Sequence, residues 1–368
     1  MRRSYVATAV ATLGVAGALV AIGVDGTSST GQSASAASKT KIALLLPESK
    51  TARYEAQDKP LFTKKVKALC PNCQIVYSNA NQDSSKQQDQ ADAALSQGVK
   101  AMVLDPVDSA SAAVIVKKAN KAKVPVISYD RLILNSKPAY YISFDNQQVG
   151  KLQASSLVSR LKAMGKTSGN LVMINGAPTD NNAGLFKKGA HSVLDKSGFK
   201  IAKEYDTPDW SPDKAQTEMQ QAITALGNDG FVGVYAANDG TSGGAIAAMK
   251  SAGIKPSTRP ITGQDAELAG IQRVLTGEQY MTIYKAIKPE AEKAAQLAVA
   301  AATGKKVPSG LITGKTNNKT TNVPSVILKP VAVTKSNIKS TVIKDGFYTV
   351  KQICTKAYAS ACKSAGLT

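Results

Sequence analysis

The sequence contains one histidine and one tryptophan in 368 residues, and aromatic residues make up only 5% of it. The single histidine, His191, lies in the middle of a helical pattern, so we interpret it as a surface residue and not as a catalytic base. Two segments, Gly165–Thr167 and Gly314–Thr316, resemble the end of a phosphate-binding loop. The first glycine of that motif is replaced by arginine in one case and by serine in the other, so neither segment predicts a phosphate site.

Cysteine is also scarce, and none of the four cysteines precedes Cys70, so the start of the chain cannot carry a lipoprotein acylation site. They form two local couples, Cys70 with Cys73 and Cys354 with Cys362. Such couples in an exported chain most simply form short-loop disulfides. A redox C-x-x-C motif usually opens a helix after a strand, and half a zinc site would need ligands that the sequence does not place nearby. We therefore predict two disulfides and no metal site.

The first forty residues have the composition of an export signal. Two arginines follow the first residue, Val6–Val24 is apolar and uncharged, and Ala34–Ala36 offers a small-residue cleavage site. This order predicts a signal peptide over residues 1–36 and a mature chain that begins near Ala37. The alternative is an uncleaved anchor, because the apolar run is close to the shortest length that spans a bilayer. Its Ala, Gly and Thr content makes it weakly hydrophobic, which favours cleavage.

Acidic residues are few relative to basic ones, with 26 Asp and Glu against 46 Lys and Arg and a net charge of +20. Only seven of the basic residues are arginine, and the lysines are spread along the chain. Nucleic-acid-binding proteins usually cluster Lys and Arg within a recognisable module, which this sequence does not show. We therefore interpret the excess as a solvated positive surface that could attract anionic wall or membrane polymers, and we predict no nucleic-acid partner.

Short apolar runs alternate with longer helical patterns from Lys41 onward. Strands separated by helices of about 10–15 residues indicate βαβ units and parallel sheets. Because 368 residues exceed one ordinary domain, we predict an α/β fold with two successive doubly wound parallel-sheet lobes, each of about four to six strands. The predicted strands are 41–46, 75–77, 101–104, 124–128, 140–144, 170–174, 199–205, 231–236 and 281–284, with a short one near 261. The predicted helices are 60–69, 83–97, 109–122, 147–164, 183–197, 213–226, 243–252 and 266–275.

Two lobes in tandem leave a cleft, and open parallel sheets bind ligands beyond the carboxyl ends of their strands. Most residues at those positions are polar, with several hydrogen-bonding atoms each: Glu48–Tyr54, Asp105, Asp130, Arg131, Asp145, Asp180–Asn182, Asn238, Asp239, Gln264, Asp265 and Lys285. Such groups suit the hydroxyls of a sugar, each of which donates and accepts hydrogen bonds. The sequence therefore predicts a sugar site in the cleft, without a cofactor.

Two aromatic residues outside periodic core runs could cover the C–H faces of a sugar. Trp210 lies in a proline-flanked loop, and Tyr54 follows Arg53 in the loop after the first predicted strand. A structural explanation is equally open for both, with Trp210 as an anchor that packs its loop and Tyr54 as a surface residue.

Several segments, in order along the chain, resemble the ribose- and galactose-type sugar-binding proteins of ABC importers. They are Ser128–Arg131 (SYDR), Tyr141–Asn146 (YISFDN), Asp180–Ala183 (DNNA), Asn238-Asp239 with Gly243–Ile246, Gly263–Ala266 (GQDA) with Leu268–Ile271, Met281–Lys285 (MTIYK) and Ile343–Phe347 (IKDGF). The GQDA, YDR and YK motifs are closest to the branch of this family that binds xylose. The resemblance runs from about Lys41 to Phe347, which is nearly the whole mature chain.

The resemblance implies the type I periplasmic-binding-protein fold, in which three crossings between the lobes form a hinge that closes on a pyranose. One lobe would comprise residues 39–145 and 286–322, and the other residues 146–285 and 323–350. An extension over residues 351–368 with its cysteine pair lies outside the family pattern. Leu46–Glu48 also departs from that pattern, because acidic residues usually follow the first strand directly. These departures concern the identity of the sugar and not the class of protein.

Carried over position by position, the resemblance implies hydrogen bonds to the sugar from Arg53, Asp130, Arg131, Asn182, Asn238, Asp265 and Lys285, with Tyr54 and Trp210 over its faces. The implied protein is an exported monomer, found outside the cell, at the cell envelope or in the periplasm. It binds xylose or a related aldose and delivers it to the membrane permease of an ABC importer.

Three other classes of protein compete with this interpretation. A repressor of the lactose-repressor family shares the fold but begins with a helix-turn-helix module, whereas this chain begins with a predicted signal peptide. A sensor protein would present the sugar to a chemoreceptor or sensor kinase. A secreted carbohydrate-active enzyme would need a carboxylic acid with a raised pKa, but Arg131 and Gln264 stand beside Asp130 and Asp265 and favour the ionised acids. We therefore predict that the chain is not an enzyme.

Overall fold

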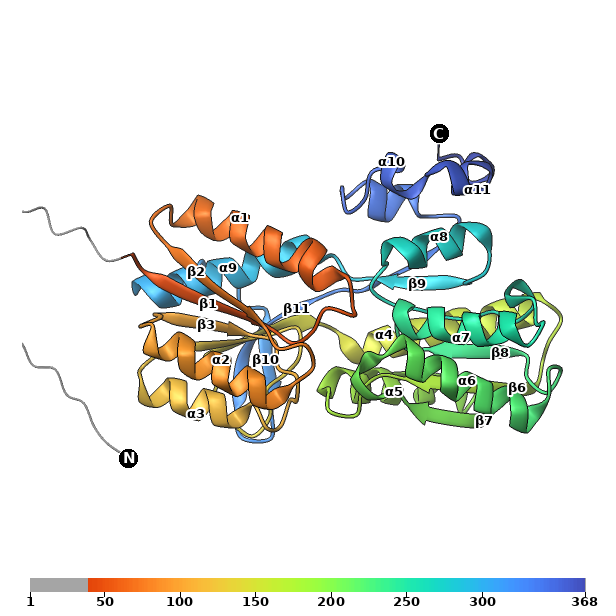
Figure 1. The fold of residues 1–368 in the computed structure, drawn as a ribbon, viewed down its shortest axis with the longest axis horizontal. Coiled ribbons are helices and arrows are strands. Elements are labelled where there is room, and N and C mark those ends of the chain that lie inside the picture. Colours follow the sequence, from red (N-terminus) through yellow and green to blue (C-terminus); the bar gives the residue numbers. More distant parts are fainter. Residues whose placement is uncertain (1–38, 368) are drawn as a thin grey trace, which may run out of the picture. The chain divides into compact units, whose positions relative to one another are not determined.

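The computed structural model describes residues 39–367, so the predicted signal peptide over residues 1–36 lies outside the described residues. Within this range the chain forms a seven-stranded sheet and a three-stranded sheet, each covered by helices on both faces, and a two-stranded sheet beside the latter (Figure 1). This is the predicted α/β architecture with two lobes. Along residues 39–367, no helix combines the length and the hydropathy that crossing a membrane requires.

The first sheet has seven strands in the order β10-β11-β5-β4-β3-β1-β2, and all neighbours are parallel except β10 and β11. Its strands β1 and β3 are continuous apolar runs because a parallel sheet is buried on both faces. The strands are β1 (Lys41–Leu46), β2 (Gln74–Asn79), β3 (Ala101–Leu104), β4 (Val126–Tyr129), β5 (Tyr140–Phe144), β10 (Gly314–Asn317) and β11 (Asn322–Leu328).

Two pairs of helices cover this sheet. Successive strand side chains point to opposite faces, so Ile42 and Leu44 of β1 pack against one pair, whereas Ala43 and Leu45 pack against the other. The first pair is α1 (Lys59–Leu69) and α9 (Ile287–Thr303), and the second is α2 (Ser84–Ser96) and α3 (Ala113–Lys121). Helix α9 is not among the predicted helices, although its alanine-rich sequence favours a helix.

The second sheet consists of three parallel strands in the order β7-β6-β8, namely β6 (Gly169–Asn175), β7 (Phe199–Asp206) and β8 (Gly233–Ala236). The segment 261–264 connects this sheet to β9 (Met281–Tyr284), because Ile261 bridges to Val234 of β8 and Gln264 bridges to Ile283 of β9. Strand β9 pairs in turn with the antiparallel strand β12 (Val331–Thr334). The helices α4 (Asn146–Ala163) and α5 (Asn181–Leu194) cover one face, and α6 (Pro212–Leu226) and α7 (Asp239–Ser251) cover the other. Helix α8 (Leu268–Thr276) precedes β9.

The chain crosses between the lobes three times, after β5, after β9 and after β11. The predicted boundary after residue 322 is wrong, because residues 323–328 belong to β11, which pairs with β5 of the first sheet from Ser325 to Leu328. The partner of β11 lies far away in the sequence, so the apolar run alone could not assign it to a lobe. One strand pair in each lobe is antiparallel, β10 with β11 and β12 with β9, beside the predicted parallel strands.

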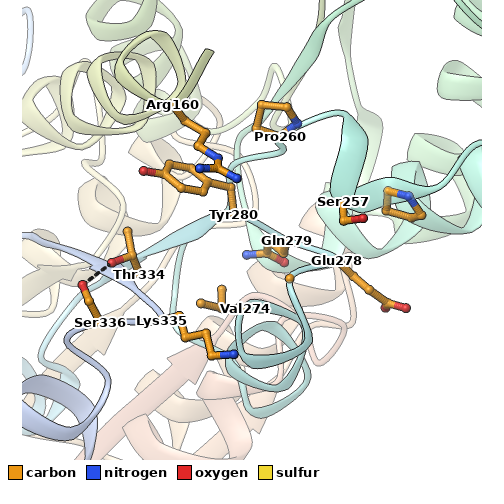
Figure 2. Close-up of a pocket in the computed structure, with 12 residues that line it drawn as sticks. Arg160, Ser257, Pro260, Val274, Glu278, Gln279, Tyr280, Thr334, Lys335 and Ser336 are labelled. Carbon is orange, nitrogen blue, oxygen red and sulfur yellow. Dashed lines mark hydrogen bonds between the residues drawn. The ribbon is translucent and has the colours of Figure 1, made fainter. Parts of the chain in front are cut away.

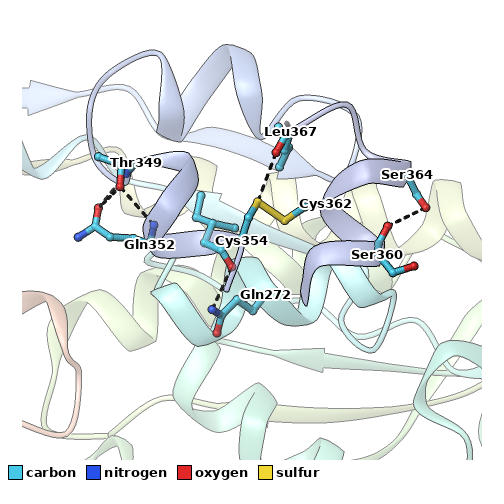
Figure 3. Close-up of a disulfide and its surroundings, with 9 residues drawn as sticks. Gln272, Thr349, Gln352, Cys354, Ser360, Cys362, Ser364 and Leu367 are labelled. Atoms are coloured by element: carbon cyan, nitrogen blue, oxygen red, sulfur yellow. Dashed lines mark hydrogen bonds between the residues drawn. A yellow bond between two sulfur atoms is a disulfide. The ribbon is translucent and has the colours of Figure 1, made fainter. Parts of the chain in front are cut away.

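The C-terminal segment packs beside α8 (Figure 1). It contains a π-helical turn (Lys339–Ile343), α10 (Val350–Ile353) and α11 (Ala359–Ser364). The disulfide between Cys354 and Cys362 joins α10 to α11, and Gln272 of α8 donates to the carbonyl of Ile353 at 3.2 Å (Figure 3). The second predicted disulfide, between Cys70 and Cys73, closes the turn between α1 and β2. Both predicted disulfides are therefore present.

Candidate functional site

A small cavity lies beyond the carboxyl ends of the strands, between the two lobes. Four lining residues were not predicted as ligands: Thr51, Asp180, Phe186 and Gln264. Phe186 gave no signal in the sequence, because it follows the core-facing period of α5. All nine residues predicted to bind the sugar also line the cavity: Arg53, Tyr54, Asp130, Arg131, Asn182, Trp210, Asn238, Asp265 and Lys285.

Local backbone structure directs these side chains. Asp130 follows β4 directly and has a φ of 51°, and Asp265 has a φ of 88°. Positive φ is uncommon for residues other than glycine and is best tolerated by Asn and Asp. Asn238 caps α7 by accepting from the N–H of Thr241 at 2.8 Å, and Lys285 follows β9 directly.

Arg53 is the centre of a buried charge network. Its Nε and Nη2 donate to the carboxylate of Asp58 at 3.0 and 2.7 Å, and Nη2 also donates to Glu290 at 3.0 Å. Its Nη1 lies 3.6 Å from a carboxylate oxygen of Asp130 and 3.6 Å from one of Asp265. Because Asp265 belongs to the second lobe, the guanidinium of Arg53 bridges the lobes beside the cavity.

Asp130 is held in its ionised form by its neighbours. Burial by itself would raise the pKa of this carboxyl, but the ammonium of Lys285 at 3.3 Å and the guanidinium of Arg53 outweigh burial, so the pKa lies below its ordinary value. The hydroxyl of Tyr54 also donates to Asp130 Oδ2 at 3.2 Å. Asp130 therefore presents a charged hydrogen-bond acceptor and not the proton of a general acid.

Asp180 orients a second cation and the only tryptophan. Its Oδ2 lies 3.1 Å from Nε of Arg131 and accepts from Nε1 of Trp210 at 3.1 Å. Asp105 Oδ1 lies 3.6 Å from the same Nε. Burial raises the pKa values of Asp180 and Asp105, and Arg131 opposes that rise. The side chains of Arg131 and Trp210 are thus fixed relative to each other.

Trp210 is only 5% exposed, and its ring meets the ring of Phe186 edge to face, with centroids 6.3 Å apart. A side chain at Gly176 would collide with the indole, so this glycine makes the room for it. The ring of Tyr54 is placed differently, because the guanidinium groups of Arg53 and Arg131 lie 5.1 and 5.9 Å from its centroid. Trp210 both packs its loop and lines the cavity, and Tyr54 is a buried residue.

Hydrogen bonds join the lobes at the rim of the cavity. The N–H of Ser109 donates to the carbonyl of Thr179 at 3.0 Å, and the Ser109 hydroxyl accepts from the N–H of Asn181 at 3.0 Å. The carbonyl of Ser109 accepts from the N–H of Leu134 at 2.7 Å and not from the next helical turn, and the helix predicted from Ser109 begins only at Ala113. The side chain of Asn182 donates to the carbonyl of Asp130 at 3.0 Å. The first turn of α5 therefore rests against the first lobe.

Features elsewhere in the described residues do not assemble an enzyme site. The segment Gly240–Gly244 spells G-x-S-x-G, but Ser242 lies inside α7, is fully buried and donates to Gln279 at 3.1 Å. His191 lies at the surface between Asp195 and Glu204. Among residues 39–367, no group of three or more His, Cys, Asp or Glu side chains is arranged to hold a metal ion.

A second depression lies at the other end of β9 (Figure 2). Its lining includes Arg160, whose guanidinium lies 5.5 Å from the ring centroid of Tyr280, and the exposed side chain of Lys335. None of the residues predicted to bind a ligand lines it.

Three comparisons relate the chain to known proteins. The family described as "Periplasmic binding protein domain" matches residues 42–306. The chain is 38% identical to the D-xylose-binding periplasmic protein of Haemophilus influenzae, over 87% of this chain and 94% of that protein. It is 36% identical to the protein of the same name from Escherichia coli, over 85% and 92%. An ABC transporter solute-binding protein from Clostridium phytofermentans with bound β-D-glucose has a similar structure, with a TM-score of 0.78, 29% identity, and coverage of 85% of this chain and 100% of that one.

Proposed function

Because the chain belongs to the periplasmic binding protein family, we propose that it is the sugar-capturing subunit of an ABC importer and that its ligand is D-xylose. The chain is accordingly a binding protein and not an enzyme. The observation that carries the proposal is the lining of the cavity between the lobes. Three cationic side chains (Arg53, Arg131 and Lys285) and three anionic ones (Asp130, Asp180 and Asp265) line it. Uncharged hydrogen-bonding groups and aromatic rings complete the lining.

Balanced charge favours a neutral ligand with many hydroxyls over an acid or an amine. Each charged group offers a hydrogen bond about twice as strong as one between neutral groups. Three buried polar atoms at the cavity form no hydrogen bond within the described residues: Nε of Arg131, Oε1 of Gln264 and Oδ1 of Asp265. The first and the last have ion-pair partners, Asp180 and Lys285, whereas Gln264 Oε1 has none. Buried polar atoms are normally paired, so we assign these atoms to the hydroxyls of the sugar.

The identity of the sugar rests on the relatives. The two relatives that carry the xylose name align over more than nine-tenths of their own length, and the sequence motifs at the strand ends favour the same branch. The structural relative with bound β-D-glucose makes a hexose the second candidate.

Isothermal titration calorimetry with D-xylose, D-glucose, D-ribose, D-galactose and L-arabinose tests the proposal. We expect one site per chain and the lowest Kd for D-xylose. A lower Kd for D-glucose would overturn the assignment of xylose, whereas heat from none of the five sugars would overturn the sugar-binding function itself.

We infer that Trp210 covers one face of the sugar, with Phe186 beside it. Tyr54 has a different role, because its ring is flanked by two guanidinium groups and its hydroxyl donates to Asp130. We therefore assign Tyr54 to the support of Asp130 and Arg131 instead of to stacking.

Trp210→Ala should weaken xylose binding by about 1–3 kcal/mol, the range for removing a large buried apolar side chain. Since Trp210 is the only tryptophan, xylose should also change the intrinsic fluorescence of the unmodified protein. The matched control is Tyr280→Ala, which removes an aromatic ring from the same lobe at the second depression (Figure 2). Unchanged affinity in Trp210→Ala would leave Trp210 only its packing role.

The remaining assignments follow from the family and the predicted leader. We infer that the protein is exported by its signal peptide, which ends near Ala36, and works outside the cytoplasmic membrane as a monomer. Its macromolecular partner is then the permease of an ABC importer, which receives the sugar from the cavity.

A further inference from the structure

A fully buried acid beside the cavity has no role in the proposed function. Asp239 is the first residue of α7, it is 0% exposed, and it does not line the cavity. Its neighbour Asn238 does line the cavity, and so does Asp265, which lies in the loop that leads into α8. A buried charge needs a physical reason, because its burial is costly unless hydrogen bonds compensate for it.

The carboxylate of Asp239 accepts three hydrogen bonds from the surroundings of that loop. Oδ2 accepts from the N–H of Glu267 at 2.8 Å and from the hydroxyl of Thr282 at 3.0 Å. Oδ1 accepts from Nε2 of Gln279 at 2.6 Å. The carboxylate therefore joins α7, the loop and β9 at one point.

The same contacts fix the backbone around Asp265. The hydroxyl of Thr282, which donates to Asp239, also accepts from the N–H of Ala266 at 3.2 Å. The N–H of Asp265 donates to the carbonyl of Ile283 at 2.8 Å. Three successive N–H groups are thus held while Asp265 and Ala266 keep φ values of 88° and 48°, a conformation that costs energy in residues other than glycine.

We propose that Asp239 is a positioning residue of the sugar site: it holds the loop so that Asp265 faces the cavity, and it sets the affinity for the sugar without touching it. The inference rests on the proposed function, since Asp265 is assigned there as a sugar ligand. Two glycines near the carboxylate support this inference, because a side chain at Gly263 or Gly270 would collide with the Asp239 carboxylate.

The charged and titratable groups around Asp239 come from three elements. Arg273 of α8 donates from Nη2 to the Asp239 carbonyl at 2.6 Å. Asp265 and Glu267 lie on the loop, and Tyr348 comes from the C-terminal segment. Burial raises the pKa of Glu267 well above its ordinary value, and the charges of Asp239 and Asp265 add to that rise.

Burial raises the pKa of Asp239 to about 7; Arg273 and the bonds from Gln279 and Thr282 oppose the rise, and Asp265 adds to it. The ionised carboxylate accepts all three hydrogen bonds. The protonated acid accepts fewer, because one of its oxygens carries a proton. The arrangement of the loop that binds sugar therefore favours the ionised form. By linkage, the affinity for the sugar should increase as the pH rises through about 7.

The test measures the Kd for D-xylose by calorimetry between pH 5.5 and 8.5. In the unmodified protein the Kd should fall about threefold or more across pH 7. Asp239→Asn places an amide N–H against existing donors, so the Kd at pH 8 should rise tenfold or more. The fall of the Kd across pH 7, which we call the pH step, should disappear in this variant. Glu267→Gln should retain the step. The control for a purely structural loss is Tyr235→Phe, which removes a buried hydrogen bond to Gln153 in the same lobe.

A second pair of variants keeps the test decisive if Asp239→Asn does not fold. Thr282→Val removes the hydroxyl that links Asp239 to Ala266 and should raise the Kd several-fold, whereas Thr282→Ser keeps that hydroxyl and should restore the affinity. Unchanged Kd in both Asp239→Asn and Thr282→Val, or a pH step that survives in Asp239→Asn, would overturn the inference. A lack of xylose binding by the unmodified protein would instead overturn the proposed function.

Discussion

Asp130→Asn should raise the Kd for D-xylose about a hundredfold or more while the protein remains folded. Asparagine keeps the shape of the side chain but leaves the ammonium of Lys285, 3.3 Å away, and the Nη1 of Arg53, 3.6 Å away, without that negative charge. Truncating one member of a buried, hydrogen-bonded charge pair at a binding site costs about 2–5 kcal/mol. Each 1.4 kcal/mol corresponds to about a factor of ten in Kd.

Calorimetry at pH 7.5 measures this loss, and thermal unfolding confirms that the variant is folded. The matched control is Asp229→Asn, which removes the same charge from a fully exposed position in the second lobe and should leave the Kd unchanged. A Kd for Asp130→Asn within threefold of the unmodified protein would contradict the central place of this carboxylate.

The pKa of Asp130 also fixes how this contribution depends on pH. A carboxyl whose pKa is lower in the folded state than in the unfolded state contributes stability above its unfolded pKa, and that stability is lost only as the pH falls through the folded pKa. The pKa of Asp130 lies below its ordinary value, so this carboxylate stays ionised between pH 5.5 and 8.5. A change in affinity near pH 7 therefore does not come from Asp130.

The sequence predicted which side chains line the cavity better than it predicted the boundaries of the lobes. Asp130 and Asp265 could be found because each lies at or just beyond the carboxyl end of a short strand run, and such ends meet at one edge of a parallel sheet. Phe186 could not be found, because its spacing from Ala183 and Ala190 is that of any core residue on a helix. Its presence in the cavity depends on how far α5 reaches towards the first lobe.

The predictions from the sequence were wrong where pairing between distant segments decides the structure. The run at 322–328 is apolar enough for either sheet, and only its pairing with β5 assigns it to the first. The surroundings of Tyr54 are a similar case. Arg53 is its neighbour in sequence, but Arg131 reaches the ring from the end of β4. A pattern that reports only on nearby residues cannot show that both groups flank the ring.

Asp265→Ala should give a folded protein that binds D-xylose weakly and no longer closes on it. Asp265 Oδ1 lies 3.6 Å from Arg53 of the first lobe and 3.3 Å from Lys285 at the second crossing. A sugar held by both lobes binds fully only when they are together, so binding energy shifts the equilibrium towards the closed form. Leaving a buried partner without its hydrogen bond costs about 1–3 kcal/mol, and more when that partner is charged.

Small-angle X-ray scattering of both proteins, with and without saturating D-xylose, measures this closure. The radius of gyration should fall on addition of xylose for the unmodified protein and for the control Asp229→Ala, but not for Asp265→Ala. The contacts across the rim between Ser109 and the start of α5 remain in the variant. If those contacts were sufficient for closure, Asp265→Ala would compact as much as the unmodified protein. Equal compaction together with unchanged affinity would mean that the sugar closes the lobes through other side chains than Asp265.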